Sequence, residues 1–197
     1  MLRMAVGIAA TTFTLGAAAA PESLTIDSLH TYPYFTINHF GLNNMMGRFD
    51  KTTGKITLDT AAKTGSVDLV IEAASLSTGD SDRGGRPRTR DEHLRSPDFF
   101  NAAEFPRIAF KGNTARWTGD APAAIEGQIT LLGVTKPLTL TVEGWKCIPD
   151  PLAQGKRQRC GGNASGTIKR SDFGMKTFIP AISDEVKLYV AIEAVGS

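Results

Sequence analysis

Apolar and polar side chains alternate in short runs along most of this chain, and Gly, Pro, Asn or Asp bounds each run. A period of two places successive side chains on opposite faces of a β-strand, so each run predicts a strand with one apolar face. The runs predict about eight strands, at 34–40, 55–58, 66–73, around Ile108 and Phe110, and at 125–131, 138–142, 164–168 and 186–194. We therefore expect an all-β fold.

One segment, 75–105, breaks this alternation. Within it, residues 91–96 predict a short helix, because the first turn is acidic and a proline follows the last residue. Phe99, Phe100 and Phe105 come next. We expect this aromatic area to pack under or across an open end of the sheet.

The length of 197 residues suits one domain, and neither an internal repeat nor a second domain is visible. Hydrophobic residues make up 41% and charged residues 21%, which excludes a disordered chain and a protein with many membrane spans. Eight antiparallel strands in one domain either stack as a sandwich or close into a barrel, and alternation alone does not choose between them. The choice matters because an eight-stranded barrel can enclose one small ligand.

The charges are nearly balanced, with 22 basic and 20 acidic side chains and a net charge of +2. Such a balance creates no large field to attract nucleic acid, so we expect no nucleic-acid partner. The arginine-containing segment 80–95 and the basic cluster at 156–159 are expected to be solvated surface, because mixed-sign charge is ordinary on loops.

The N-terminus predicts a signal peptide over residues 1–19, with Arg3, an apolar stretch at 4–15 and small residues at 16–20. The cleaved bond follows residue 19 or residue 20. The apolar stretch is too short to span a bilayer, so no stable membrane span is expected after processing. The remaining chain, 20–197, is then one exported domain.

Export would place Cys147 and Cys160 in an oxidising compartment, where a pair normally forms a disulfide. The residues between them, 148–159, contain two prolines, a glycine and three basic residues, which predict a surface loop joining two strands. A redox-active or metal-binding pair is the alternative, but the C-x-x-C spacing and a nearby histidine are both missing.

Candidate chemistry is sparse. The only histidines are His30, His39 and His93, and their spacing matches no standard metal motif such as H-E-x-x-H. Hydrogen-bonded structural roles are therefore expected for them. No G-x-S-x-G, G-x-G-x-x-G or P-loop occurs, so we expect neither catalytic residues nor a cofactor or metal.

Several longer motifs lie in order along the chain. They are Ile26-Asp-Ser-Leu-His30 with Phe35-Thr-Ile-Asn-His39, Gly47-Arg-Phe49, Asp91-Glu-His-Leu-Arg-Ser-Pro-Asp-Phe-Phe100, Gly127-Gln-Ile-Thr-Leu-Leu-Gly-Val-Thr-Lys-Pro137 and Arg170-Ser-Asp-Phe-Gly-Met175. Together they resemble the YceI-like polyisoprenoid-binding family over nearly the whole exported chain. The cysteine-flanked segment 148–159 and the Arg/Gly-rich segment 81–90 depart from the family pattern.

The resemblance implies a lipocalin-like antiparallel barrel with a short helix, exported to the bacterial periplasm. It also implies noncatalytic binding of a long isoprenoid or related amphipathic lipid, such as a polyprenyl chain, an isoprenoid quinone or a fatty chain. A homodimer is left open. Two alternatives remain: an interaction module with a filled core, and an enzyme that acts on such a lipid with a His-bound metal.

An apolar chain needs a dry tunnel lined by inward-facing side chains. The candidate wall residues are Phe35, Ile37, Ile71, Phe99, Phe100, Phe105, Phe110, Ile129, Leu131, Phe173 and Met175. The same residues would also describe a solid core. The candidate contacts for a polar head group are His30, Arg48, His93, Arg95 and Arg170, because arginine offers paired donors to oxygen atoms.

Overall fold

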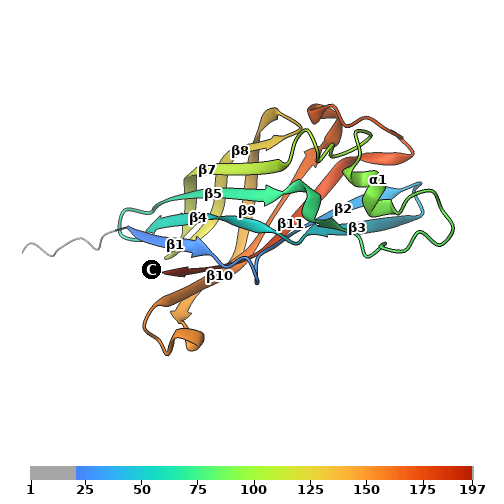
Figure 1. Cartoon of the computed structure of the whole chain (residues 1–197). Coiled ribbons are helices and arrows are strands. Elements are labelled where there is room, and N and C mark those ends of the chain that lie inside the picture. Colours follow the sequence, from blue (N-terminus) through green and yellow to red (C-terminus); the bar gives the residue numbers. More distant parts are fainter. Residues whose placement is uncertain (1–20, 197) are drawn as a thin grey trace, which may run out of the picture.

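The computed structural model describes residues 21–196, and β-strands make up most of that range (Figure 1). The predicted signal peptide, 1–19, lies outside the described residues. The strands within them are β1 (Glu22–Ile26), β2 (Tyr32–His39), β3 (Asn43–Phe49), β4 (Thr52–Asp59), β5 (Thr64–Glu72), β6 (Leu76–Ser77), β7 (Arg107–Thr118), β8 (Ala121–Leu131), β9 (Val134–Pro149), β10 (Gln158–Lys169) and β11 (Ile182–Gly196). The helical elements there are α1 (Arg90–Arg95) and the short 3-10 turns η1 (Ala73–Ser75), η2 (Pro151–Ala153) and η3 (Arg170–Phe173).

Eight of these strands close into an antiparallel barrel. Their order around the ring is β1-β4-β5-β7-β8-β9-β10-β11, and β11 returns to β1 with Leu24 opposite Gly196 and Ile26 opposite Ala194. Closure abolishes the free sheet edges that a sandwich would keep. The predicted eight-stranded barrel is therefore confirmed.

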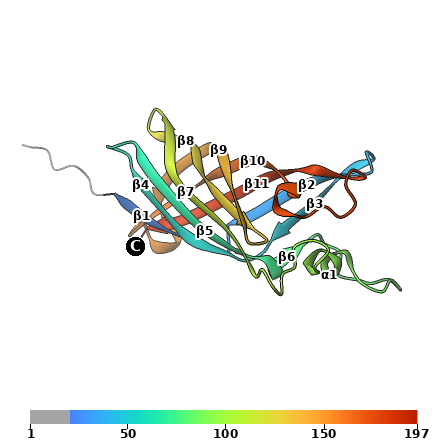
Figure 2. The same ribbon diagram turned by 90° about the horizontal axis from the view of Figure 1, so that it is seen from above.

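The remaining strands, β2, β3 and β6, lengthen the barrel at one end (Figure 2). β1 and β2 both pair with β11. On their other sides, β1 pairs with β4 and β2 pairs with β3. β6 continues β5 but pairs with β3 through only two residue pairs. The up-and-down barrel therefore contains three interrupted strands, formed by β1 with β2, by β4 with β3 and by β5 with β6.

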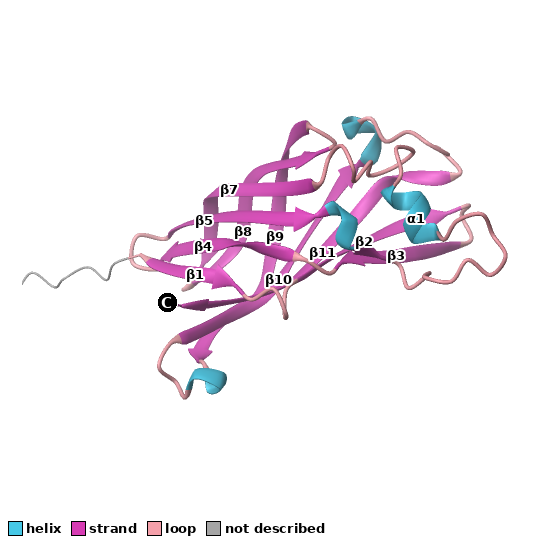
Figure 3. Cartoon of the chain, in the orientation of Figure 1, coloured by secondary structure: helices cyan, strands magenta, loops and turns pink. Residues whose placement is uncertain are grey.

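The two ends of the barrel differ. We call one the helix end, with the β2–β3 hairpin, α1 and residues 174–181; we call the other the disulfide end, with the β9–β10 hairpin and the junction of β1 with the last residues of β11. Figure 3 shows α1 at the first of these ends and the short helical turn of the β9–β10 hairpin at the other. The long strands β10 and β11 connect the two.

The sequence pattern predicted β2, β4, β5 and β7 to β11, and it missed β1, β3 and the two-residue β6. In β3 the inward positions include Gly47, which breaks the apolar alternation. A Cβ atom at Gly47 would lie 2.3 Å from Cζ of Phe35 on the neighbouring strand. The glycine is therefore required by the ring beside it, although in the sequence it looks like part of a turn.

Helix α1 follows from local sequence. The Thr89 hydroxyl accepts a hydrogen bond from the Glu92 backbone N–H at 3.0 Å, and the Thr89 N–H donates to the Glu92 carboxylate at 2.8 Å. This reciprocal capping satisfies two donors that the first turn leaves free. The helix ends at Arg95, shortly before Pro97, so its position differs by one residue from the predicted 91–96.

The segment between the cysteines is shorter as a loop than predicted. Strand β9 continues to Pro149 and β10 starts at Gln158, so only 150–157 lie outside the ladder. Cys147 and Cys160 face each other directly in the register and form a disulfide. The predicted disulfide thus joins two paired strands.

Candidate binding cavity

A cavity of about 540 Å³ fills the half of the barrel nearest the helix end. Its wall is almost entirely apolar and comes from the inward faces of the strands, from α1 and from the segments beside them. The lining residues are Pro33, Tyr34, Phe35, Ile37, His39, Phe40, Met45, Met46, Phe49, Leu69, Ile71, Thr78, Arg90, His93, Leu94, Phe99, Phe100, Ile108, Phe110, Ile129, Leu131, Leu138, Leu140, Ile168, Arg170, Met175, Phe178, Ile182, Val186, Leu188 and Val190.

Nine of the eleven predicted wall residues line this cavity: Phe35, Ile37, Ile71, Phe99, Phe100, Phe110, Ile129, Leu131 and Met175. Phe105 and Phe173 do not, and their predicted placement is corrected. The Phe105 ring lies against Gly133 in the β8–β9 turn, and Phe173 is buried in η3 within the core. Both lie outside regular strands, where the alternation rule gives no information about direction.

Three aromatic rings pack together in the cavity wall, close to where the short strand β6 pairs with β3 through only two residue pairs. Phe35 from β2, Phe49 from β3 and Phe100 from the segment after α1 have ring centroids 5.4–6.2 Å apart. The Phe49 and Phe100 rings meet edge to face, an arrangement that aromatic quadrupoles favour. The expected packing of the post-helix aromatic segment across an open end thus holds for Phe100.

Several wall residues that the prediction missed carry a usable signal. Val186, Leu188 and Val190 share one parity on β11, and Leu138 with Leu140 shares one on β9. Strand parity could have found these five. Met45 and Met46 could not be found this way, because β3 was not recognised.

Of the predicted head-group contacts, only His93 and Arg170 line the cavity. His30 borders a separate groove at the disulfide end, with its ring nitrogen 3.0 Å from Asp27. Arg48 is away from the cavity, over the ring of Tyr32 at 5.0 Å. These placements correct the prediction for His30 and Arg48.

Arg48 and Arg95 are engaged elsewhere. Asp50 lies 2.7 Å from the Arg48 guanidinium and raises the pKa of that group. Arg95 donates to the backbone carbonyl of Leu76 and so attaches α1 to β6. The prediction for Arg95 is therefore also corrected, because its side chain binds β6 and does not line the cavity.

Arg170 holds the segment that caps the helix end. Its side chain is only 2% exposed, and its guanidinium donates to four backbone carbonyl oxygens, those of Ser183 (2.9 Å), Met175 (3.2 Å), Thr177 (2.8 Å) and Ile182 (2.9 Å). Burial lowers the pKa of Arg170, and the nearby Asp184 carboxylate opposes that change. With four bonds to the backbone, this group positions residues 174–182.

Thr78 and Arg90, two polar residues that the sequence did not single out, join His93 at the cavity. The Arg90 Nε donates to the Thr78 hydroxyl at 2.9 Å, and that hydroxyl donates to Asp91 at 2.6 Å. The His93 Nε2 lies 3.0 Å from Asp98. The Arg90 and His93 side chains are 38% and 25% exposed, so each one borders the cavity and also contacts solvent.

The Arg/Gly-rich segment 81–90, of which Arg90 lines the cavity, pairs with acidic side chains close to it in the sequence. Arg86 binds Asp80 at 2.7 and 2.9 Å, Arg83 binds Glu92, and the hydrogen bonds from Arg86 and from the Arg90 backbone lower the pKa of Asp80 to about 2. Arg83 and Arg86 are thus part of the solvated, mixed-charge surface that the sequence predicted, whereas Arg90 lines the cavity and departs from that prediction.

An ionic network closes the disulfide end. The Arg159 guanidinium lies 2.7 Å from Asp27 and from Glu193, and 3.2 Å from the fully buried Asp150. Burial raises the pKa of Asp27, but hydrogen bonds from Arg159 and His30 outweigh it and lower that pKa to about 2. The network therefore connects β1, β10 and β11 where the ring closes.

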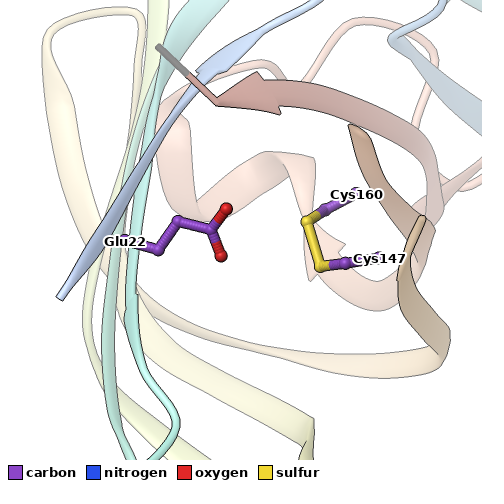
Figure 4. A group of neighbouring side chains, drawn as sticks. All are labelled: Glu22, Cys147 and Cys160. Atoms are coloured by element: carbon purple, nitrogen blue, oxygen red, sulfur yellow. A yellow bond between two sulfur atoms is a disulfide. The ribbon is translucent and has the colours of Figure 1, made fainter. Parts of the chain in front are cut away.

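Two groups of potential metal ligands lie in this region. The oxygen and sulfur atoms of Glu22, Cys147 and Cys160 lie within 4.8 Å of one another, but Figure 4 shows the two sulfurs joined in the disulfide. In the second group, formed by Asp27, His30 and Glu193, the cationic Arg159 already binds both carboxylates. Neither group presents free ligands for a metal.

No helix in residues 21–196 has the length and apolar character needed to cross a membrane.

Comparison with known proteins agrees with the fold and extends it to a family. The chain is 35% identical over 189 residues to Protein YceI of Salmonella arizonae, covering 95% of this chain and 94% of the relative. The YCEI protein of Campylobacter jejuni matches with a TM-score of 0.65 at 28% identity, covering 82% and 90% of the two chains. A polyisoprenoid binding domain from Saccharophagus degradans shares the fold with a TM-score of 0.63 at 16% identity, covering 89% and 99%. The family model described as YceI-like domain matches residues 24–194, and the chain therefore belongs to the YceI-like family.

Proposed function

We propose that this barrel binds one long isoprenoid or related amphipathic lipid in its cavity and carries it without chemical change. The observation that carries the proposal is the apolar cavity of about 540 Å³, within the usual range for small-molecule sites. The Saccharophagus degradans domain of the same fold, a polyisoprenoid binding domain, adds support.

The wall suits an apolar chain better than a polar ligand. Burying apolar surface contributes about 25 cal/mol per Å², so a long tail gains affinity without any polar contact. Met45, Met46 and Met175 in the wall are flexible and can repack around tails of different shape. The proposal therefore includes tolerance for polyprenyl, quinone and fatty chains.

As contacts for the polar head group we propose His93, which the sequence predicted, and Arg90, which it did not. Both line the cavity, and both keep part of their side chain exposed. A quinone oxygen or a phosphate could accept hydrogen bonds from an arginine and an imidazole. Arg170 is less suited, because its donors already serve backbone carbonyls.

The two alternatives have less support. An interaction module with a filled core predicts no cavity of this size. An enzyme with a metal held by all three histidines needs them together, yet His30 borders the groove at the disulfide end while His39 and His93 line the cavity at the helix end.

We also propose that the protein works in the periplasm. The apolar and small residues at 1–20 support export, and the disulfide supports an oxidising compartment. The intact mass of the protein from its own host tests this. Loss of 19 or 20 residues and recovery in the periplasmic fraction are expected; an unprocessed chain in the cytoplasm would contradict it.

The binding proposal is tested by mass spectrometry of an organic extract from protein purified out of its host periplasm, with a denatured sample as control. A stoichiometric isoprenoid or fatty amphiphile is expected. Leu188→Trp, which adds bulk to the cavity wall, should remove it. Lys187→Trp adds the same bulk on the exposed outer face of β11 and should keep it. Equal lipid content in both variants would argue against binding in this cavity.

A further inference from the structure

Four large apolar side chains are exposed together at the helix end. Phe40, Met46 and Phe178 are 57%, 60% and 55% exposed although each also lines the cavity, and Leu42 beside them is 82% exposed. We call these four the apolar rim. Exposed apolar surface next to polar groups marks an interaction site more often than chance placement does. The apolar rim makes the outer surface continuous with the cavity wall.

The backbone holds two of these side chains in place. Phe40 and Phe178 have φ angles of 56° and 62°, in the left-handed region that bulky residues rarely adopt. The Phe40 N–H donates to the carbonyl of Ala181 at 2.8 Å, and the Ile182 N–H donates to the carbonyl of Phe178 at 2.8 Å. The β2–β3 hairpin and residues 174–181 are thus bound to each other, with an exposed phenylalanine on each.

The charges of segment 78–98, next to the apolar rim, cancel, and the exposed Lys176 near Phe178 adds a single positive charge. Segment 78–98 contains five arginines and five acidic residues. Four of those arginines pair with acidic side chains of the same segment, in the pairs Arg83–Glu92, Arg86–Asp80, Arg88–Asp98 and, at 3.8 Å, Arg90–Asp80. A surface of this kind has no strong field for a highly charged partner. Its attraction must come mainly from the apolar side chains.

We propose that the apolar rim docks the helix end onto the surface of a lipid bilayer, so that the tail moves between bilayer and cavity without crossing water. This inference rests on the proposed function, because an isoprenoid lipid resides in a bilayer. Aromatic and aliphatic side chains enter the headgroup and acyl boundary readily. A bilayer is favoured over a protein partner because the rim leads directly into the cavity that would receive the tail.

Vesicle sedimentation with purified protein and phosphatidylcholine vesicles tests this docking. The key variant is Leu42→Asp, because Leu42 is exposed and does not line the cavity. Its matched control is Leu152→Asp, since Leu152 is 75% exposed but lies at the disulfide end. Binding should fall about tenfold for Leu42→Asp, equivalent to losing one buried leucine contact, and stay unchanged for Leu152→Asp.

Three results would overturn the docking: no vesicle binding by the wild type, an equal loss in both variants, or loss of binding at an ionic strength of about 1 M, where surface charges are screened. Capture of a protein partner by the rim in place of vesicles would also overturn it. Lipid content of the same samples separates the two proposals. Bound lipid without vesicle binding rejects only the docking, and vesicle binding by a lipid-free protein rejects only the cargo.

Discussion

The helix end and the disulfide end are connected by the long strands β10 and β11 but differ in how completely the ring of strands is paired. At the disulfide end the ring is closed by β1 and β11, and the apolar pocket inside that part of the barrel, lined by Ile56, Ile125 and Trp145 among others, is only about 40 Å³. At the helix end β6 pairs with β3 through two residue pairs, and α1 with its following aromatic segment completes the wall around about 540 Å³. Space for a ligand therefore occurs where the hydrogen-bonded ring is interrupted.

The largest expected loss of stability follows a substitution at the helix end. Arg170→Ala should lower the free energy of unfolding by about 4 kcal/mol, because four backbone carbonyls lose their buried donor. Urea unfolding measures the change, with exposed Lys169→Ala as the control. A loss similar to that of the control would mean that residues 174–182 are held by other contacts.

Truncating an interior leucine to alanine should cost different amounts of stability at the two ends. Leu24→Ala at the disulfide end should cost about 3 kcal/mol, because Leu24 is fully buried in packed core. Leu188→Ala should cost about 1 kcal/mol, because its side chain already borders empty space and loses fewer contacts. Both values come from denaturant unfolding. Equal costs would remove the distinction between a packed end and a hollow end.

Removing the disulfide should affect stability and not the cavity. Replacing Cys147 and Cys160 together by serine should cost about 3 kcal/mol, because the crosslink restrains the unfolded chain. Thermal or urea unfolding measures this, and a reducing agent should have no further effect on the variant. Lipid content should stay unchanged, so loss of lipid would show that the two ends are coupled.

The pH dependence of the ionic network at the disulfide end should be smaller than the effect of removing Arg170 or the disulfide. The folded pKa of Asp27 is lowered from 3.8 to about 2, so its carboxylate stabilises the fold above pH 3.8 and that contribution is lost as the pH falls towards 2. The contribution is about 2 kcal/mol, from a change of nearly two pKa units. Asp27→Asn should therefore be less stable than the wild type at neutral pH, with the difference shrinking near pH 2. A difference that is constant with pH would contradict this role for the Asp27 charge.

Sequence alone located most elements and much of the wall. Alternation found the parity of Phe35 and Ile37, and the acidic first turn with the following Pro97 located α1 to within one residue. The alternation rule failed where the residue required at a position depends on a side chain from another strand. Gly47 is explained only by the ring of Phe35, which belongs to another strand.

What the sequence by itself determined is local: which segments form strands, which face of each is apolar, where a short helix begins, and which cysteines can pair. What only the tertiary structure decided is which distant segments meet, as Leu24 meets Gly196 to close the ring and Arg90 meets the cavity beside His93. The physical reason is that a repeat of two reports the side of a sheet from adjacent residues alone. Ring closure, cavity volume and the partners of a buried arginine depend on the positions of many segments at once.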